Sequence, residues 1–212
     1  GNGKGPCRGG TTALVYDTRT QTLERHFLSL AGTKKNCAGG PTPWGSWVTC
    51  EEWTQQADDQ CAVDHGYCFD VPATAEPGLA DPVPLKAMGR FRHEAIAVDP
   101  ESGVVYLTED EHDGLLYRFI PERRNDLSAG RLQALAIRGK DSMDLRNWDE
   151  SSSGQSVPVG DVAAVRWIDL EQTDNPNNDL RQRGFKAGAA RFARGEGMWY
   201  GRKSVYFACT TG

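Results

Sequence analysis

Residues 94–138 read EAIAVDPESGVVYLTEDEHDGLLYRFIPERRNDLSAGRLQALAIR, and this stretch decides the predicted fold. Its four short apolar runs are Glu94–Val98, Val104–Glu109, Leu115–Ile120 and Arg131–Ile137. The segment Asp99–Gly103 between the first two is a turn, because Pro100 presets φ and Gly103 accepts a positive φ. Four short antiparallel strands in about 45 residues have the size of one propeller blade.

A motif that leads into this stretch occurs again elsewhere in the chain. Arg92-His93-Glu94-Ala95 precedes one pair of strands, and Arg194-Gly195-Glu196-Gly197 precedes another that ends in Ser204–Ala208. A partial third copy is Trp44–Glu52. Repeats of short strands indicate a radially repeated β-fold. We therefore predict an all-β chain, a β-propeller, in which residues 1–212 form a single domain of about four to five blades and a fragment of a larger propeller.

The other predicted elements follow from alternation and turn residues. We expect a hairpin (Thr11–Asp17 with Thr22–Leu30), a Gly/Pro loop (Asn36–Pro43), strands at Trp44–Glu51, Gly66–Val71 and Val162–Leu170, an edge strand at Leu85–Met88, an insertion loop at Lys140–Gly160, a loop or short exposed helix at Asp174–Arg183, and a final hairpin of Ala189–Phe192 with Gly197–Ala208.

Composition limits the classes of partner. The net charge of −5 and the pI of about 5.4 argue against nucleic acid as the main partner, because no basic cluster offsets them. The longest apolar runs are far shorter than the ~20 residues of a membrane-spanning helix. The sequence shows no initiator methionine, signal peptide or twin-arginine segment. Together with the strand at its end, this favours a piece of a longer chain.

Six cysteines permit disulfides without fixing them. Cys61 and Cys68 are close in a polar segment, so a local disulfide and two free thiols both remain open. Cys50 and Cys209 lie in apolar strands, where we expect free thiols. Cys37 lies among small residues in Asn36–Gly40. Its sulfur could meet a metal as the thiolate, or it could be a buried thiol in a tight turn.

Several glutamates end or begin strands at corresponding places in the repeats. Equivalent positions in successive blades point to the central axis, and converging carboxylates need cations between them. The candidates are Glu51, Glu94, Glu109 and Glu196. Glu51 and Glu52 alternate faces, and we expect Glu52 to be the solvated one. For the others, a solvated turn or a surface ion pair is the simpler alternative.

Arg194 and Glu196 are two residues apart, so in an extended segment both side chains share a face. A cation and a carboxylate together suit the binding of a metal and an anion. The four histidines lack HxH and HxxxH spacing, so we do not expect a histidine-based zinc site. GxSxG, Walker and Rossmann motifs are also missing.

Together these motifs resemble the PhoX family of alkaline phosphatases. The matching segments, in family order, are Asn36–Gly40, Thr42–Gly45 with Thr49–Glu52, Phe91–Glu94 with Tyr106–Asp110, and Arg194–Glu196 with Val205–Phe207. The resemblance implies a β-propeller that hydrolyses small phosphomonoesters with a cluster of iron and calcium ions. The cluster would polarise the phosphate and supply the nucleophilic oxygen.

The resemblance also assigns roles to residues. It makes Cys37 the thiolate ligand of iron, and Glu51, Glu94 and Glu196 carboxylate ligands of the cluster. Glu109 or Asp110 would add another. Arg194 would hold the substrate phosphate, so Arg194 and Glu196 are the predicted catalytic residues. Family members are exported, which implies a periplasmic or secreted location.

The chain departs from the family pattern at two places. Arg194-Gly195-Glu196-Gly197 stands where the family pattern is closer to Arg-Pro-Glu-Trp, and Glu52 is followed directly by Trp53. This favours a sister branch. Two other functions therefore stay open: a calcium-dependent propeller lactonase or esterase, which needs no thiolate, and a non-catalytic propeller scaffold that binds a partner protein.

Overall fold

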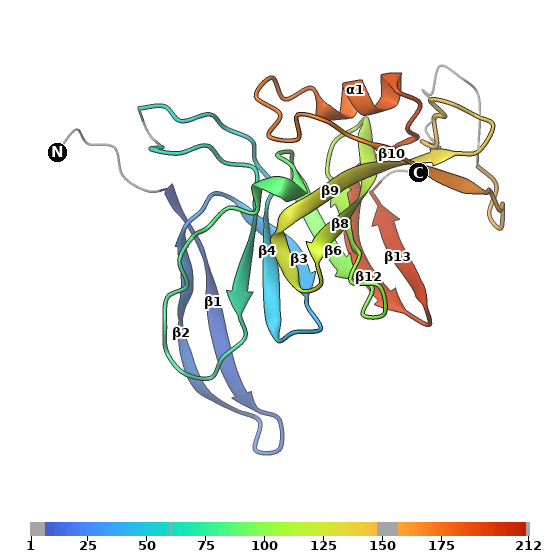
Figure 1. Ribbon diagram of the computed structural model, residues 1–212. Coiled ribbons are helices and arrows are strands. Elements are labelled where there is room, and N and C mark those ends of the chain that lie inside the picture. Colours follow the sequence, from blue (N-terminus) through green and yellow to red (C-terminus); the bar gives the residue numbers. More distant parts are fainter. Residues whose placement is uncertain (1–6, 60, 148–156, 211–212) are drawn as a thin grey trace.

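The computed structural model describes residues 7–59, 61–147 and 157–210. The chain begins with an antiparallel hairpin of β1 (Cys7–Asp17) and β2 (Thr22–Gly32), which projects from the rest of the molecule (Figure 1). The predicted hairpin is confirmed. It extends further than expected at its open end, because the pairing continues to Cys7 and Gly32.

A large curled sheet occupies the centre of the described chain (Figure 1). Its strands, in spatial order, are β10 (Val165–Asp169), β9 (Asp126–Ile137), β8 (Gly114–Arg123), β7 (Val105–Glu109), β6 (His93–Val98), β3 (Asn36–Pro41), β4 (Ser46–Glu51) and β5 (Cys68–Pro72), and β11 (Arg191–Phe192) pairs with β8. A separate hairpin joins β12 (Gly195–Gly201) and β13 (Ser204–Cys209).

Antiparallel units follow one another along the chain, as propeller blades do. They are the β1–β2 hairpin, β3–β4–β5, β6 to β10, and the β12–β13 hairpin. The predicted unit of four strands is confirmed as β6–β7–β8–β9. β10 then adds to β9, which confirms a strand within 162–170. The described part of the chain is all-β, as predicted, apart from two short helices.

The segment that begins at Asn36 is a strand and not the predicted loop. β3 pairs antiparallel with β4 and parallel with β6, where Gly39 lies opposite Ala95. A Cβ at Gly40 would lie 2.2 Å from the Ile96 carbonyl oxygen, and one at Gly39 would lie 2.0 Å from that of Val48. The glycines therefore allow an approach between strands that a side chain would prevent.

Two other elements differ from the sequence prediction. The segment 86–88 is a 3-10 helix, η1 (Lys86–Met88), because Gly89 at φ 92° ends the turn and Met88 enters the core. The final hairpin contains β12 and β13 alone, since β11 pairs with β8. The range Asp174–Arg183, predicted as a loop or a short exposed helix, is a turn-rich segment that leads into the helix α1 (Leu180–Lys186), whose first residue is buried. The predicted insertion loop lies partly outside the described residues.

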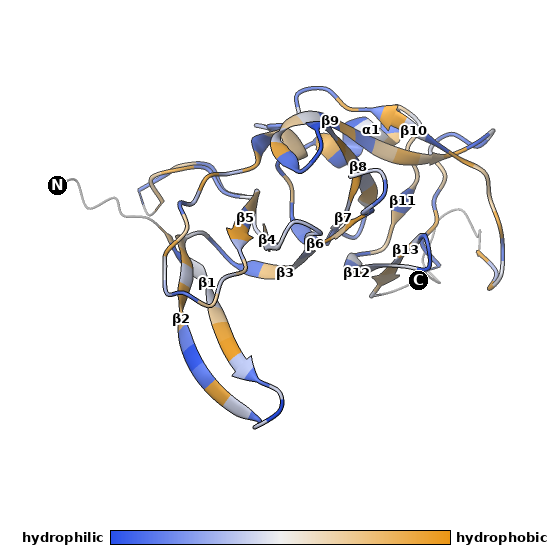
Figure 2. Cartoon of the chain, turned by 60° about the horizontal axis from the view of Figure 1, so that its bottom comes forward, coloured by the Kyte–Doolittle hydropathy of each residue, from blue (hydrophilic) through white to orange (hydrophobic). Residues whose placement is uncertain are grey.

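The main core packs between the central sheet and the short helices. It includes Phe91, Tyr117, Phe119, Leu107 and Met88, all fully buried. Figure 2 shows hydrophobic residues in central strands such as β5 and β8, and also along part of β1. On the hairpin, by contrast, Leu14 is 66% exposed and Leu28 is 53% exposed. No described helix is long and apolar enough to cross a membrane.

The cysteine pairing corrects one sequence alternative. Cys7 and Cys61 form a disulfide, so the local Cys61–Cys68 bridge is wrong. Cys68 lies instead on β5 directly opposite Cys50 on β4, with the two sulfurs 3.6 Å apart. The sequence could not show this pairing, because 54 residues separate Cys7 from Cys61. Cys50 and Cys209 are free thiols, as predicted.

A buried ion pair anchors the segment that leads to Arg194. Asp144 accepts hydrogen bonds from Arg146 and from Arg191 at the start of β11. Burial alone would raise the pKa of Asp144, but these bonds hold it below its usual range. A depressed folded-state pKa means that the carboxylate stabilises the fold above the unfolded pKa of about 4 and stops doing so as the pH falls.

We therefore expect Asp144→Asn to lower the free energy of unfolding by about 2 kcal/mol at neutral pH. The difference from the wild type should shrink progressively as the pH falls below about 4 toward the depressed folded-state pKa, because the unfolded wild-type chain then binds a proton that the folded protein does not. Denaturant unfolding at several pH values measures this. Asp169→Asn is the control, since Asp169 is 61% exposed and pairs with the exposed Arg131. An equal loss at every pH would contradict the account.

Candidate metal centre

Three acidic or thiol side chains meet where β3, β4 and β6 lie side by side. The ligand atoms of Cys37, Glu52 and Glu94 all lie within 4.8 Å of one another. Cys37 is in β3, Glu52 directly follows β4, and Glu94 is in β6. The close β3–β6 pairing at Gly39 brings Cys37 to the level of Glu94, and the Cys37 thiol donates a hydrogen bond to Glu94 Oε1 at 3.0 Å.

Burial and like charge act on this thiol and this carboxyl group. Burial and, after it, the hydrogen bond to Glu94 and the charge of Glu94 together raise the pKa of Cys37 to about 12. Burial also raises the pKa of Glu94, as do the charges of Glu52 and Glu196. Among the described residues, Glu94 forms no ion pair with a lysine or arginine. A cation would remove both penalties, because it stabilises the thiolate and the carboxylates.

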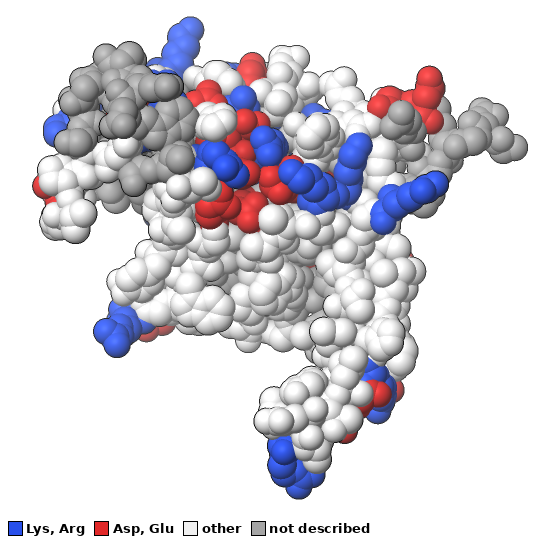
Figure 3. All heavy atoms as spheres, turned by 180° about the vertical axis from the view of Figure 1, so that it is seen from behind, with Lys and Arg blue, Asp and Glu red and all other residues white. Residues whose placement is uncertain are grey.

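Basic side chains surround the outer side of the group. Glu52 pairs with Arg92 and with Lys35, each at 2.9 Å. Arg92 also lies 3.7 Å from Asp110 and 3.7 Å from Glu111. Figure 3 shows acidic and basic side chains mixed in one patch of the molecular surface. The surroundings of the group therefore contain both acidic and basic side chains, and Glu52 is paired with two basic ones.

Arg194 reaches the same region from the segment between β11 and β12. Its guanidinium binds Asp110 through Nε at 2.7 Å and Nη2 at 3.1 Å, and Nη2 lies 3.2 Å from Glu196 Oε1. The hydrogen bonds from Arg194 lower the pKa of Asp110, although burial opposes the shift. Arg194 itself has φ of 53°, a strained value for a residue with a side chain. Such strain is often found at functional sites.

Glu196 lies at the edge of the group. Its carboxylate accepts a hydrogen bond from the Thr210 hydroxyl, and its charge acts on both Glu94 and Cys209. The predicted pairing of Arg194 with Glu196 on one face is therefore observed. Thr108 binds the Glu196 carbonyl oxygen at 2.7 Å and thereby fixes β12 against β7.

Two predicted candidates point elsewhere. The Glu51 carboxylate is fully buried and accepts hydrogen bonds from His65 and from the backbone N–H groups of Lys34, Gly66 and Tyr67. Glu109 is also buried and binds the Tyr117 hydroxyl and the Leu115 N–H. The structure does not bring either carboxylate into the group of Cys37 and Glu94.

Their sequence neighbours lie at the group instead. Glu52, which we expected to be solvated, has a side chain only 12% exposed and belongs to the group, so that expectation is wrong. Asp110 contacts Arg194 in place of Glu109. The alternation of faces predicted that only one of Glu51 and Glu52 could point to the site, but it did not indicate which one.

The donor set fits metal ions. A thiolate with carboxylates suits iron, and carboxylates alone suit calcium. Cys37 also lines a groove of about 770 Å³ between β1 and the β3–β4 pair. The described residues therefore offer a first set of ligands for one or more cations, together with Arg194 for an anion.

The comparisons with known proteins agree with this geometry. The sequence model described as "Alkaline phosphatase PhoX" matches residues 5–212. No curated protein matches the chain. Among solved structures, "Pseudomonas fluorescens PhoX in complex with vanadate, a transition state analogue" matches with a TM-score of 0.53 and 20% identity, over 94% of this chain and 44% of that one.

At this identity the structural match shows the fold, which is the β-propeller predicted from the sequence. The chain spans less than half of the matched structure. The family match, by contrast, covers nearly the whole chain. The chain therefore belongs to the PhoX family of alkaline phosphatases.

Proposed function

We propose that this chain forms part of a metal-dependent phosphomonoesterase. The observation that carries the proposal is the group of Cys37, Glu52 and Glu94, where a half-buried thiol donates a hydrogen bond to a buried carboxyl group beside further acids. The family match and the vanadate complex of the Pseudomonas fluorescens protein support it, because vanadate there is described as a transition-state analogue.

Cys37, Glu52 and Glu94 would hold the cations, with Glu196 and Asp110 at the edge of the centre. We propose iron at the thiolate and calcium among the carboxylates. Bound cations would supply Lewis-acid polarisation of the phosphoryl oxygens and an oxygen nucleophile. Glu51 and Glu109 were further candidates from the sequence. In this proposal they support the strands and do not bind metal.

Arg194 would bind and orient the phosphate. Its bonds to Asp110 and Glu196 fix the guanidinium at the mouth of the centre, where it is 35% exposed. Among the described residues, its Nη1 atom has no hydrogen-bond partner and remains free for an anion. A planar guanidinium suits phosphate oxygens, and a fixed cation stabilises the charge that develops on them.

A calcium-only lactonase fits the geometry less well, because a thiol belongs to the donor group and calcium prefers oxygen ligands. We further propose a periplasmic or secreted location. The Cys7–Cys61 disulfide supports it, since structural disulfides persist in oxidising compartments. The proposed function is tested by assaying the metal-loaded protein with a phosphomonoester and a lactone; hydrolysis of the lactone alone would contradict it.

We expect Arg194→Gln to lower kcat/KM for a phosphomonoester by about 100-fold or more, because a preorganised cation is lost. Arg194→Lys should recover only part of the loss, since lysine keeps the charge without the planar fork. Steady-state kinetics with a chromogenic phosphomonoester measures both. Arg131→Gln is the control, with a side chain 65% exposed on the surface. Unchanged kinetics in Arg194→Gln would exclude this role.

A further inference from the structure

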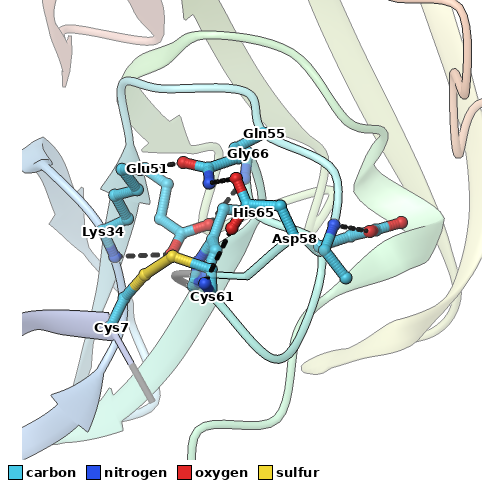
Figure 4. Close-up of a disulfide and its surroundings, with 10 residues drawn as sticks. Cys7, Lys34, Glu51, Gln55, Asp58, Cys61, His65 and Gly66 are labelled. Carbon is cyan, nitrogen blue, oxygen red and sulfur yellow. Dashed lines mark hydrogen bonds and ion pairs between the residues drawn. A yellow bond between two sulfur atoms is a disulfide. The ribbon is translucent and has the colours of Figure 1, made fainter. Parts of the chain in front are cut away.

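A second group of potential ligands lies outside the candidate metal centre. The sulfurs of Cys7 and Cys61 and a ring nitrogen of His65 all lie within 4.8 Å of one another. Cys7 begins β1, whereas Cys61 and His65 belong to the loop between β4 and β5. Figure 4 shows the imidazole of His65 beside the disulfide that joins the two cysteines.

His65 is held in one orientation by Glu51. Its Nδ1 lies 2.7 Å from Glu51 Oε1, and the ring is only 1% exposed. Glu51 also accepts hydrogen bonds from the N–H groups of Lys34 at 2.8 Å and Gly66 at 2.6 Å, so it acts as an acceptor throughout. The Nδ1 atom therefore donates the hydrogen bond to Glu51, which leaves Nε2 for another partner.

That partner is missing among the described residues. Nε2 of His65 is one of the few buried side-chain nitrogens or oxygens without a hydrogen bond. Leaving a buried polar atom unpaired costs roughly 1–3 kcal/mol. The His65 ring has this unpaired nitrogen and lies beside two sulfurs. The unpaired nitrogen is an observation independent of the cysteines themselves, and it points to a ligand that all three residues share.

We propose that Cys7, Cys61 and His65 bind Zn²⁺ when the Cys7–Cys61 disulfide is reduced. Zinc bonds of about 2.3 Å to sulfur and about 2.0 Å to nitrogen place tetrahedral ligands between 3 and 4 Å apart, roughly, which small side-chain movements from the observed group achieve. A carboxylate bound to the second ring nitrogen commonly accompanies a histidine that ligates zinc, and Glu51 has this position.

The fourth ligand is a water molecule that enters beside Cys7, the partly exposed member of the group. The sequence did not indicate this site, because spacing among histidines says nothing about a histidine that meets two cysteines only in the folded chain. Glu51 thus has a role that its position next to Glu52 obscured in the sequence.

The metal and the disulfide exclude each other. A dithiol reductant gives two electrons and two protons to the disulfide, which becomes two thiols, and the reductant becomes a disulfide. Zn²⁺ then displaces the two thiol protons and binds the thiolates. A disulfide oxidant reverses the process: it takes two electrons from the thiolates, the sulfur–sulfur bond forms again and Zn²⁺ leaves. The site is therefore available before the chain is oxidised and again under reducing conditions.

Cobalt(II) is the probe, because its thiolate complexes absorb strongly and Zn²⁺ displaces it. The experiment uses the full chain with Cys37→Ser, so that the thiol of the candidate metal centre does not contribute. After anaerobic reduction, we expect one Co²⁺ per chain with thiolate-to-cobalt absorption, displacement by Zn²⁺ with a Kd below about 1 μM, and protection of two thiols from alkylation. The oxidised chain should show none of these.

Two variants locate the site. Cys61→Ser and His65→Asn should each weaken Zn²⁺ binding by about 10- to 100-fold or more. The asparagine of His65→Asn keeps a hydrogen-bond donor toward Glu51 while it removes Nε2. Cys209→Ser should bind as the background does. If Cys61→Ser does not fold, judged by circular dichroism, Cys7→Ser replaces it. Three results would contradict the proposal: no cobalt–thiolate band after reduction, a Zn²⁺ affinity in the cysteine variants equal to that of the background, or equal metal binding by the oxidised chain. Each would show that the two cysteines form a structural disulfide only.

Discussion

Replacing Cys37 with serine is expected to lower kcat/KM for a phosphomonoester by more than about 100-fold and to remove the bound iron. Changes in residues that merely support a metal ligand cost 10- to 100-fold, roughly, so the loss of a direct ligand should exceed that range. The Cys37 sulfur lies 3.0 Å from Glu94 and belongs to the donor group, and a hydroxyl is a poor ligand for the cation that a thiolate binds.

The matched control is Cys209→Ser, a half-buried free thiol outside the donor group, which should keep its iron and its activity. Activity and metal content are measured on the same preparations. A Cys37→Ser protein that hydrolyses phosphomonoesters normally would remove the thiolate from the mechanism. A normal rate with calcium bound and iron lost would favour a calcium-only hydrolase.

The second expected result separates two adjacent glutamates. Glu52→Gln should remove metal and activity, since Glu52 belongs to the donor group, but it should change the free energy of unfolding by only about 1 kcal/mol. Glu51→Gln should do the opposite. Its fully buried carboxylate accepts hydrogen bonds from His65 and from three backbone N–H groups, and an amide NH₂ would face these donors.

Breaking such a buried arrangement costs about 3–5 kcal/mol, which corresponds to a fall in Tm of roughly 10 °C for a chain of this size. Thermal unfolding and metal content of both variants measure the contrast. The folded part of the Glu51→Gln sample should retain its metal. Loss of metal in Glu51→Gln with unchanged stability, together with a normal Glu52→Gln protein, would return the ligand role to Glu51.

The strands could be predicted from the sequence wherever alternation and turn residues agree. The unit of β6 to β9 follows from Asp99–Gly103 and the apolar runs around it, and the β1–β2 hairpin from the turn after Asp17. The strand β3 could not, because its glycine-rich sequence is typical of a loop. It becomes a strand only through close contact with Val48 and Ile96 on its neighbours.

The candidate site was predictable in its segments but not in every side chain. Cys37, Glu94, Arg194 and Glu196 come together as the motifs indicated. The choice between Glu51 and Glu52 depends on His65, which lies on a loop that the sequence showed only as polar. The choice between Glu109 and Asp110 likewise depends on Tyr117, which lies on the neighbouring strand β8, opposite Leu107. Such contacts arise from tertiary structure and leave no local signal.

The central claim is that Cys37, Glu52 and Glu94 hold metal ions for phosphoryl chemistry, and elemental analysis tests it most directly. The protein is purified without chelator, beside a Cys37→Ser and Glu94→Gln double variant. The account predicts iron together with calcium in the wild type and loss of the iron in the variant. A wild type without iron, or a double variant that retains the same iron and calcium content, would contradict it.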